Sequence, residues 1–319
     1  MIDRACISIS GRCNMQCLYC HFRNKSNEYD DLSLPDAIEI IDKMSDYINQ
    51  NKISTFKIGL VGAGEALFQF PLIKEIVEYA NKQSDAFSFY TITNGININE
   101  EILEYFYSEK NKIHLNFSLD GNQEIHDMYR IKNGTGTFEA VFKSIKNYEK
   151  IFGKKPEINC TVHKTTLEKK NELFQFLKKE RFENVCFSKI VNVEGMELEI
   201  KNEKFYQFLQ DAKINGISTR QHRVINSADC IMYGKKCGVG INNIFYSDGK
   251  IYPCGRFAKM EKYVIGKYGD SLEEIERKMK QFTPVEEGQC YYDLNAPPQS
   301  KIKFQTEQRI EGMRMEEMK

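Results

Sequence analysis

Six short apolar segments, each followed by a segment with helical spacing, place the strongest constraint on the fold. The predicted strands cover residues 5–10, 55–61, 87–93, 112–119, 157–163 and 184–190. The predicted helices begin at Ser33 and at residues 71, 99, 137 and 167, the first with apolar side chains at helical spacing. Such alternation favours repeated βαβ units and a parallel sheet. The pattern alone leaves open whether the sheet is doubly wound or forms a barrel.

The alternation ends near residue 200, and a segment of different composition follows. We expect a helix at 202–214, then a hairpin at 241–252 whose turn is Asp248-Gly249, and a late helix at 271–282. Residues 296–319 are polar with weak periodicity and are expected to be a tail. The predicted organisation is therefore a core domain at 1–200, a smaller Cys-rich domain at 201–295 and the tail.

Composition narrows the class of protein. The 319 residues include 45 basic and 45 acidic side chains, and no basic stripe indicates nucleic acid. No apolar run approaches the roughly 20 residues that cross a bilayer, and the first residues show no signal-peptide pattern. We therefore expect a cytoplasmic protein with neither nucleic-acid nor membrane partners. In that compartment the ten cysteines indicate metal binding or catalysis rather than disulfides.

Three of these cysteines stand within eight residues, at Cys13, Cys17 and Cys20. Thiolates are soft ligands for zinc or for an iron–sulfur cluster. Three protein ligands on a four-iron cluster would leave one iron open for a substrate or cofactor. The alternatives from the residues alone are structural zinc, with His21 as the fourth ligand, or ordinary buried cysteines.

Polar or glycine motifs also follow the predicted strands, where ligands bind in folds of this kind. Gly64 and Glu65 follow the second strand and Asn94 follows the third. Ser118 and Asp120 end the fourth strand, two residues apart and therefore on one side of it. Each motif alone is an ordinary turn or helix cap, but their recurrence at successive strand ends indicates a binding site.

The C-x3-C-x2-C loop, together with these strand ends, resembles the radical SAM (S-adenosylmethionine) superfamily over roughly residues 1–195. The resemblance implies a partial (β/α)6 barrel whose three-cysteine [4Fe-4S] cluster binds SAM. Ala63 and Ala66 stand where the family often has Gly and Pro. The residues that match the family's SAM contacts are Tyr19, Gly64, Glu65, Asn94, Ser118 and Asp120, with Arg130 matching a stretch of the peptide-modifying branch.

A second cysteine group contains Cys230, Cys237, Cys254 and Cys290. Four thiolates can fully ligate a [4Fe-4S] cluster or a zinc ion. The spacing Cys237-x11-Gly249-x4-Cys254 resembles the start of the SPASM/Twitch extension of radical SAM enzymes, without its later Cys-rich run. The resemblance implies one auxiliary [4Fe-4S] cluster. Cys6, Cys160 and Cys186 lie on predicted strands and are expected to be buried.

By this resemblance the chain is a peptide maturase that reductively cleaves SAM to a 5′-deoxyadenosyl radical. The radical would abstract hydrogen from a ribosomally made peptide, leading to cross-linking, epimerisation or oxidation. One alternative is a dehydrogenase like the anaerobic sulfatase maturases, which forms formylglycine from Ser or Cys. An alternative of another class is a zinc-stabilised binding module without activity. The expected partners are a precursor peptide, a flavodoxin or ferredoxin, and a separate leader-peptide-binding protein.

Overall fold

A nine-stranded sheet runs through the computed structural model, which describes all residues except 21, 23–28, 192–196, 221–227 and 296–319. The predicted tail therefore lies outside the described residues. The strand order is β13-β12-β11-β1-β2-β3-β4-β7-β8, and the six strands from β1 to β8 are parallel. These six strands are β1 (Arg4–Ser8), β2 (Phe56–Val61), β3 (Phe87–Thr93), β4 (Ile113–Ser118), β7 (Ile158–Val162) and β8 (Val185–Lys189).

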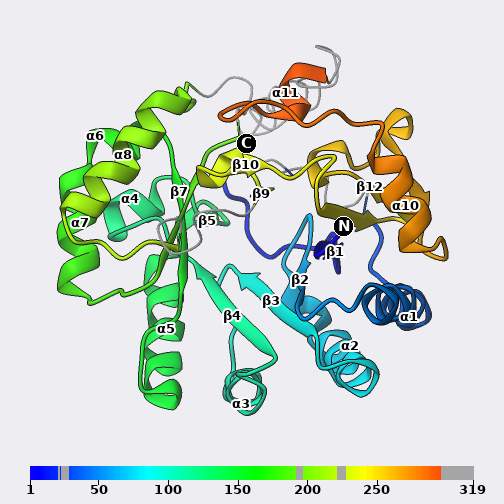
Figure 1. Ribbon diagram of the computed structural model, residues 1–319. Coiled ribbons are helices and arrows are strands. Elements are labelled where there is room, and N and C mark those ends of the chain that lie inside the picture. The colour runs from blue at the N-terminus through cyan, green and yellow to red at the C-terminus, as the bar shows by residue number, and fades with distance from the viewer. Residues whose placement is uncertain (21, 23–28, 192–196, 221–227, 296–319) are drawn as a thin grey trace, which may run out of the picture.

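Helices follow these strands and cover the outer face of the curved sheet (Figure 1). They are α1 (Leu34–Asn51), α2 (Phe70–Gln83), α3 (Glu100–Ser108), α5 (Phe138–Phe152), and the pair α6 (Lys164–Glu168) and α7 (Lys170–Lys179). Ser33 caps α1 by accepting a hydrogen bond from the Asp36 N–H, as its sequence position predicts. The alternating parallel arrangement expected from the sequence is confirmed, with the last predicted helix divided at Lys169.

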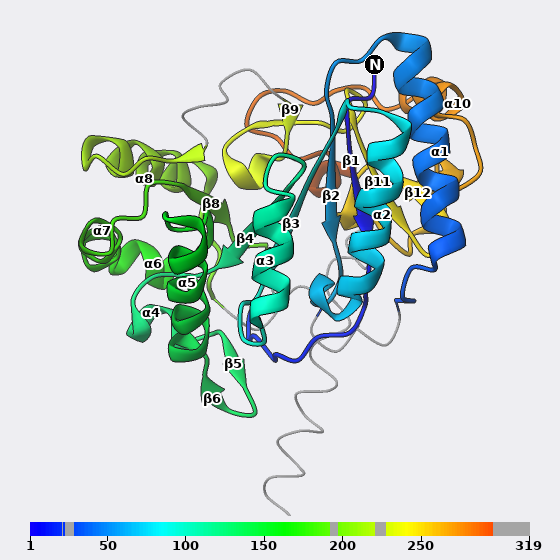
Figure 2. The same ribbon diagram turned by 90° about the horizontal axis from the view of Figure 1, so that it is seen from below.

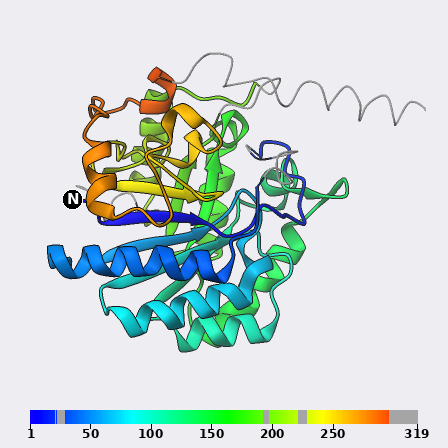
Figure 3. The same ribbon diagram turned by 90° about the vertical axis from the view of Figure 1, so that its right-hand side faces the viewer.

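The segment after residue 200 begins with α8 (Asn202–Ile214), at the predicted residues. The predicted hairpin is β11 (Asn243–Ser247) and β12 (Lys250–Tyr252), and its turn residue Asp248 has a left-handed φ of 51°. β11 pairs in parallel with β1, so the hairpin extends the sheet of the first segment. β13 (Gly266–Lys267), α10 (Leu272–Met279) and α11 (Tyr291–Asn295) complete this part, which lies across β1 from α1 (Figure 3).

Short elements that the sequence did not predict follow β4. They are α4 (Gln123–Asp127) and a hairpin of β5 (Ile131–Lys132) and β6 (Thr135–Gly136). The pair β9 (Ala228–Asp229) and β10 (Lys236–Cys237) was also not predicted. In the part of the chain that the structure describes, no helix is both long and apolar enough to span a bilayer.

Candidate active site

The cysteine loop leaves the carboxyl end of β1 and is held by the segment that leads into β5. The Gln16 N–H donates to the Ile131 carbonyl at 2.8 Å, and the Leu18 N–H donates to the Tyr129 carbonyl at 2.8 Å. The hairpin β5–β6 projects at the same end of the sheet as this N-terminal loop (Figure 2). The unpredicted hairpin therefore serves as a backbone support for the cysteine loop.

The three thiols of the loop act electrostatically on one another, which places them in one neighbourhood. Cys13 is exposed, whereas Cys17 and Cys20 are half-buried. Burial, with smaller contributions from the charges of Cys20 and Cys13, raises the pKa of Cys17 to about 12. Three mutually repelling thiolates need a cation to be stable together. His21, the fourth ligand in the zinc alternative, lies outside the described residues.

Gly64 and Glu65 bring the end of β2 against the start of the cysteine loop. The Gly64 N–H donates to the Ser10 carbonyl at 3.0 Å, and the Glu65 N–H donates to the Arg12 carbonyl at 2.7 Å. A Cβ at Gly64 would lie 2.0 Å from the Arg12 carbonyl oxygen, so the two backbones can approach this closely only at glycine.

The Glu65 carboxylate is buried and accepts hydrogen bonds from two backbone N–H groups. They belong to Asn94 at 2.7 Å and Leu67 at 3.3 Å. The Asn94 amide in turn donates to Asn14 Oδ1 at 2.8 Å and reaches 3.9 Å from Cys13 Sγ. Burial raises the pKa of Glu65, although these donors oppose the shift. A cation beside this carboxylate would offset the burial.

On the other side of the cysteine loop, the Asp120 carboxylate accepts several hydrogen bonds. One of its oxygens accepts from the Tyr19 hydroxyl and from Arg130 Nε, the latter at 2.8 Å. The other oxygen accepts from the Thr161 N–H at 2.8 Å. Burial opposes ionisation of Asp120, but Arg130 and these donors hold its pKa below the ordinary value. The Arg130 guanidinium also lies 5.5 Å from the centre of the Tyr19 ring.

His126 supports Asp120 from the backbone side, and its partners define its tautomer. Its Nδ1 accepts from the Asp120 N–H at 3.4 Å, so this nitrogen carries no proton. The Thr137 hydroxyl donates to the Arg130 carbonyl, so it accepts from His126 Nε2 at 3.1 Å. Burial and the nearby Arg130 lower the pKa of His126 to about 3. The imidazole is therefore neutral and part of the support for Asp120 and Arg130.

Three further residues in this neighbourhood were not predicted: Thr161, Tyr129 and His163. The Tyr129 and His163 rings meet edge to face at 4.7 Å, and each lies 6.0 Å from the Tyr19 ring. Thr161 and His163 stand at the end of the fifth predicted strand, so the rule applied to the other strand ends would have found them. Ser118 ends β4, half-buried, in register with Asn159 of β7.

Three members of the second cysteine group, Cys237, Cys254 and Cys290, lie close enough to act electrostatically on one another. The charges of Cys237 and Cys290 both act on Cys254, and burial raises the pKa of Cys254 to about 12. Arg256 donates from Nη1 to Cys290 Sγ at 3.2 Å and pairs with Asp293 at 2.9 Å. A guanidinium beside these thiols favours their thiolate form.

Cys230, the fourth member, immediately precedes the short 3-10 helix η3 (Ile231–Tyr233), which packs against β8. The segment from Cys230 to Cys237 thus leads from β8 toward β11. These two are the outermost of the parallel strands. Among the described residues, no three His, Cys, Asp or Glu side chains gather as ligands of a single metal ion. In a four-iron cluster each thiolate binds a separate iron.

The remaining thiols are found on strands, as expected. Cys160 and Cys186 are buried, and burial raises the pKa of Cys160. Cys6 is half-buried, with its sulfur 3.5 Å from the Tyr90 hydroxyl oxygen. The expected burial is confirmed for the first two and is partial for Cys6.

The chain matches one family model and several curated proteins. Residues 7–177 match the family model described as the Radical SAM superfamily. The cysteine-type anaerobic sulfatase-maturating enzyme of Clostridium novyi is 26% identical over 289 residues, covering 81% of this chain and 74% of that enzyme. The antilisterial bacteriocin subtilosin biosynthesis protein AlbA of Bacillus subtilis is 30% identical over 143 residues, covering 44% of this chain and 29% of AlbA.

Solved structures show the same fold. A structure described as native anSMEcpe with bound AdoMet superposes with a TM-score of 0.71 at 22% identity, covering 88% of this chain and 82% of that one. Streptococcus suis SuiB superposes with a TM-score of 0.70 at 15% identity, covering 96% and 77%. SuiB has also been solved bound to the precursor peptide SuiA. The partial-barrel expectation is thereby confirmed.

Proposed function

Because this chain belongs to the radical SAM superfamily and is an enzyme of that class, we propose that it modifies a residue of a ribosomally made peptide. Membership of an enzyme superfamily removes the alternative of a zinc-stabilised module without activity. The observation that carries the proposal is the convergence of the three-thiol loop with Glu65 and the Asp120–Arg130 pair at the carboxyl ends of the strands.

The residues at this end of the sheet fit SAM and its cluster. Cys13, Cys17 and Cys20 would hold three irons, and the cluster would supply the cation that their mutual repulsion requires. Glu65, buried and held by uncharged hydrogen-bond donors, would receive the methionyl ammonium group. Gly64 keeps the β2 end and the loop in backbone contact. Bound there, SAM and the reduced cluster would supply a 5′-deoxyadenosyl radical for hydrogen abstraction, with release of methionine.

The remaining predicted contacts of SAM surround the Asp120 network. Tyr19 would lie against the adenine, and Ser118 and Asp120 would approach the ribose. Arg130 would act mainly through Asp120, because its Nε already donates to that carboxylate at 2.8 Å. The neutral His126 fixes the Asp120 backbone. These residues would bind and orient SAM and exclude water from it.

Cys230, Cys237, Cys254 and Cys290 would ligate one auxiliary [4Fe-4S] cluster. Three of these thiols act on one another, and Arg256 stands beside Cys290 to balance the charge. With all four irons ligated by protein, such a cluster suits electron transfer and support of the site. A low-potential one-electron donor, a flavodoxin or ferredoxin, would reduce the clusters in a cytoplasmic setting, and a separate leader-binding protein would present the peptide.

The second candidate, formylglycine formation, is favoured by the similarity to the C. novyi sulfatase-maturating enzyme over 81% of this chain. The lack of the later Cys-rich run of a full SPASM domain counts against it. Incubation with SAM, dithionite and a sulfatase-derived peptide containing the target Cys separates the two. Loss of the peptide's sulfur to an aldehyde would establish the second candidate. If the chain is a peptide maturase, no such product should form. A precursor peptide encoded near this gene should instead be modified, which mass spectrometry would detect.

A further inference from the structure

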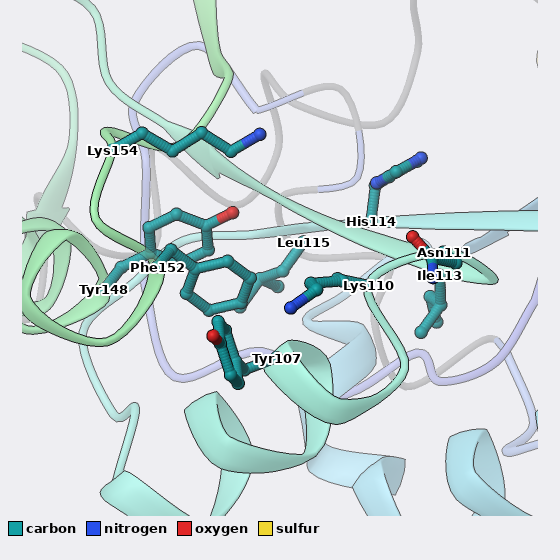
Figure 4. A pocket seen from close by; sticks show the side chains of 9 residues that line it. All are labelled: Tyr107, Lys110, Asn111, Ile113, His114, Leu115, Tyr148, Phe152 and Lys154. Carbon is teal, nitrogen blue, oxygen red and sulfur yellow. The ribbon is translucent and has the colours of Figure 1, made fainter.

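A cavity of about 540 Å³ lies at the opposite end of the strands from the cysteine loop. It borders the start of β4 and the C-terminal ends of α3 and α5 (Figure 4). The register joins β4 to β7 at Phe117–Ile158 and Ser118–Asn159, so residues 113–116 precede the paired stretch. The cavity lies beside this part of β4, where Ile113 and Leu115 are among its lining residues.

Three aromatic rings form one wall of the cavity. The Tyr148 and Phe152 rings stack in parallel at 3.7 Å, and the Tyr107 ring meets Phe152 edge to face at 5.3 Å. Tyr148 is buried, whereas Tyr107 is 41% exposed. These rings are rigid and offer apolar surface with hydroxyl groups at the margin, a composition typical of binding surfaces.

The rest of the lining is polar and consists of two lysines, His114 and Asn111. Lys110, Lys154 and His114 are exposed, and none of the nine described residues that line the cavity is acidic. Glu157, whose charge acts on His114, is already held by Arg220 at 3.1 Å and by the Asn116 amide at 3.0 Å. In the view of Figure 4, Lys154 lies above and Lys110 below the space between Phe152 and His114. The two lysines supply the ammonium groups of the lining, and that of Lys110 lies 3.9 Å from the centre of the Tyr107 ring.

We propose that this cavity binds an acidic segment of the peptide substrate, with a carboxylate between Lys110 and Lys154 and a neighbouring apolar side chain against Phe152. Because the cavity and the cysteine loop are at opposite ends of the strands, the bound segment is remote from the residue that reacts. A peptide is favoured over a single small acid because the lining extends from the exposed Tyr107, Lys110 and Lys154 to residues 113–115 at the start of β4. The proposal rests on a peptide being the substrate.

Isothermal titration calorimetry with the reconstituted enzyme tests the proposal. The probes are a capped hexapeptide of alternating glutamate and leucine, its glutamine–leucine counterpart, and capped glutamate alone as the free-acid arm. The variant is Lys110→Gln with Lys154→Gln. Its control is Lys82→Gln with Lys213→Gln, which removes the same charge from exposed positions elsewhere.

The acidic hexapeptide should bind the wild type and the control with equal affinity. It should bind the cavity variant at least fivefold more weakly, and this difference in affinity should shrink at high salt. SAM cleavage without peptide should be unchanged in both variants, which separates this proposal from the proposed function. Equal binding to the cavity variant, equal binding of the glutamine peptide, or no binding to the wild type would overturn it. Binding of capped glutamate as tight as that of the hexapeptide would assign the cavity to a small acid instead.

Discussion

Arg130 Nε lies 2.8 Å from Asp120 Oδ2, and the two side chains are 11% and 1% exposed. This buried ion pair joins the end of β4 to the segment that supports the cysteine loop. Removing one partner of such a pair leaves an uncompensated buried charge. The pair therefore connects the stability of the fold to the geometry of the site.

Asp120→Asn should lower the free energy of unfolding by about 3–5 kcal/mol, because Arg130 stays charged without its carboxylate. Chemical denaturation followed by circular dichroism measures this value. The double variant Asp120→Asn with Arg130→Met should recover part of the loss. Asp85→Asn, which breaks the exposed pair with Lys112, is the control and should change nothing measurable. Equal losses of unfolding free energy in Asp120→Asn and Asp85→Asn would contradict this prediction.

His126 should make stability depend on pH. Its pKa of about 3 in the folded protein lies below the ordinary value of 6.5, so the unfolded chain takes up a proton first as the pH falls. The stabilisation that neutral His126 provides is present above pH 6.5 and is lost toward pH 3, by about 1.4 kcal/mol per pH unit. The difference in unfolding free energy between wild type and His126→Gln should shrink accordingly below pH 6.5. A difference that is constant with pH would show that folding does not lower the pKa of His126.

Gly64→Ala should weaken SAM binding strongly with little loss of secondary structure. Its Cβ would lie 2.0 Å from the Arg12 carbonyl oxygen, so the end of β2 and the cysteine loop must separate. Equilibrium dialysis with labelled SAM measures the loss, expected to be at least tenfold. The control is Gly269→Ala, whose Cβ would meet only the movable Glu39 carboxylate. Wild-type affinity in Gly64→Ala would mean that this backbone contact does not position SAM.

Much of this fold could be predicted because its signals are local. Buried strands and amphipathic helices show their periodicity in the sequence, and Ser33 and Asp248-Gly249 mark a helix start and a turn through their own backbone chemistry. Each strand of the hairpin β5–β6 has two residues, which is too few to show a periodic pattern. The pairing of β11 with β1 joins residues more than 230 positions apart, which no local pattern encodes.

The candidate site was predicted in part for the same reason. Glu65 and Asp120 stand at strand ends, where polar side chains are informative. The supporting role of His126 depends on Thr137 and on the Asp120 backbone, which only the folded chain brings together. The pairing of Arg130 with Asp120 likewise depends on the fold, and the expected role of Arg130 at SAM stays a prediction.

The second cysteine group should hold a cluster independently of the first. Cys254→Ser should lower the iron content of anaerobically reconstituted protein from about eight to about four per chain. Cys186→Ala, a strand thiol outside both groups, should keep the full content. Iron analysis with Mössbauer spectroscopy provides the measurement. An unchanged iron content in Cys254→Ser would remove Cys254 from the ligands.

Formation of 5′-deoxyadenosine from SAM by the reconstituted, dithionite-reduced protein tests the central claim most directly. The wild type should release 5′-deoxyadenosine and methionine, as measured by liquid chromatography with mass spectrometry. The triple variant Cys13→Ala, Cys17→Ala, Cys20→Ala should release neither while keeping about four irons at the second group. A wild-type protein that holds its iron but leaves SAM intact would contradict the account.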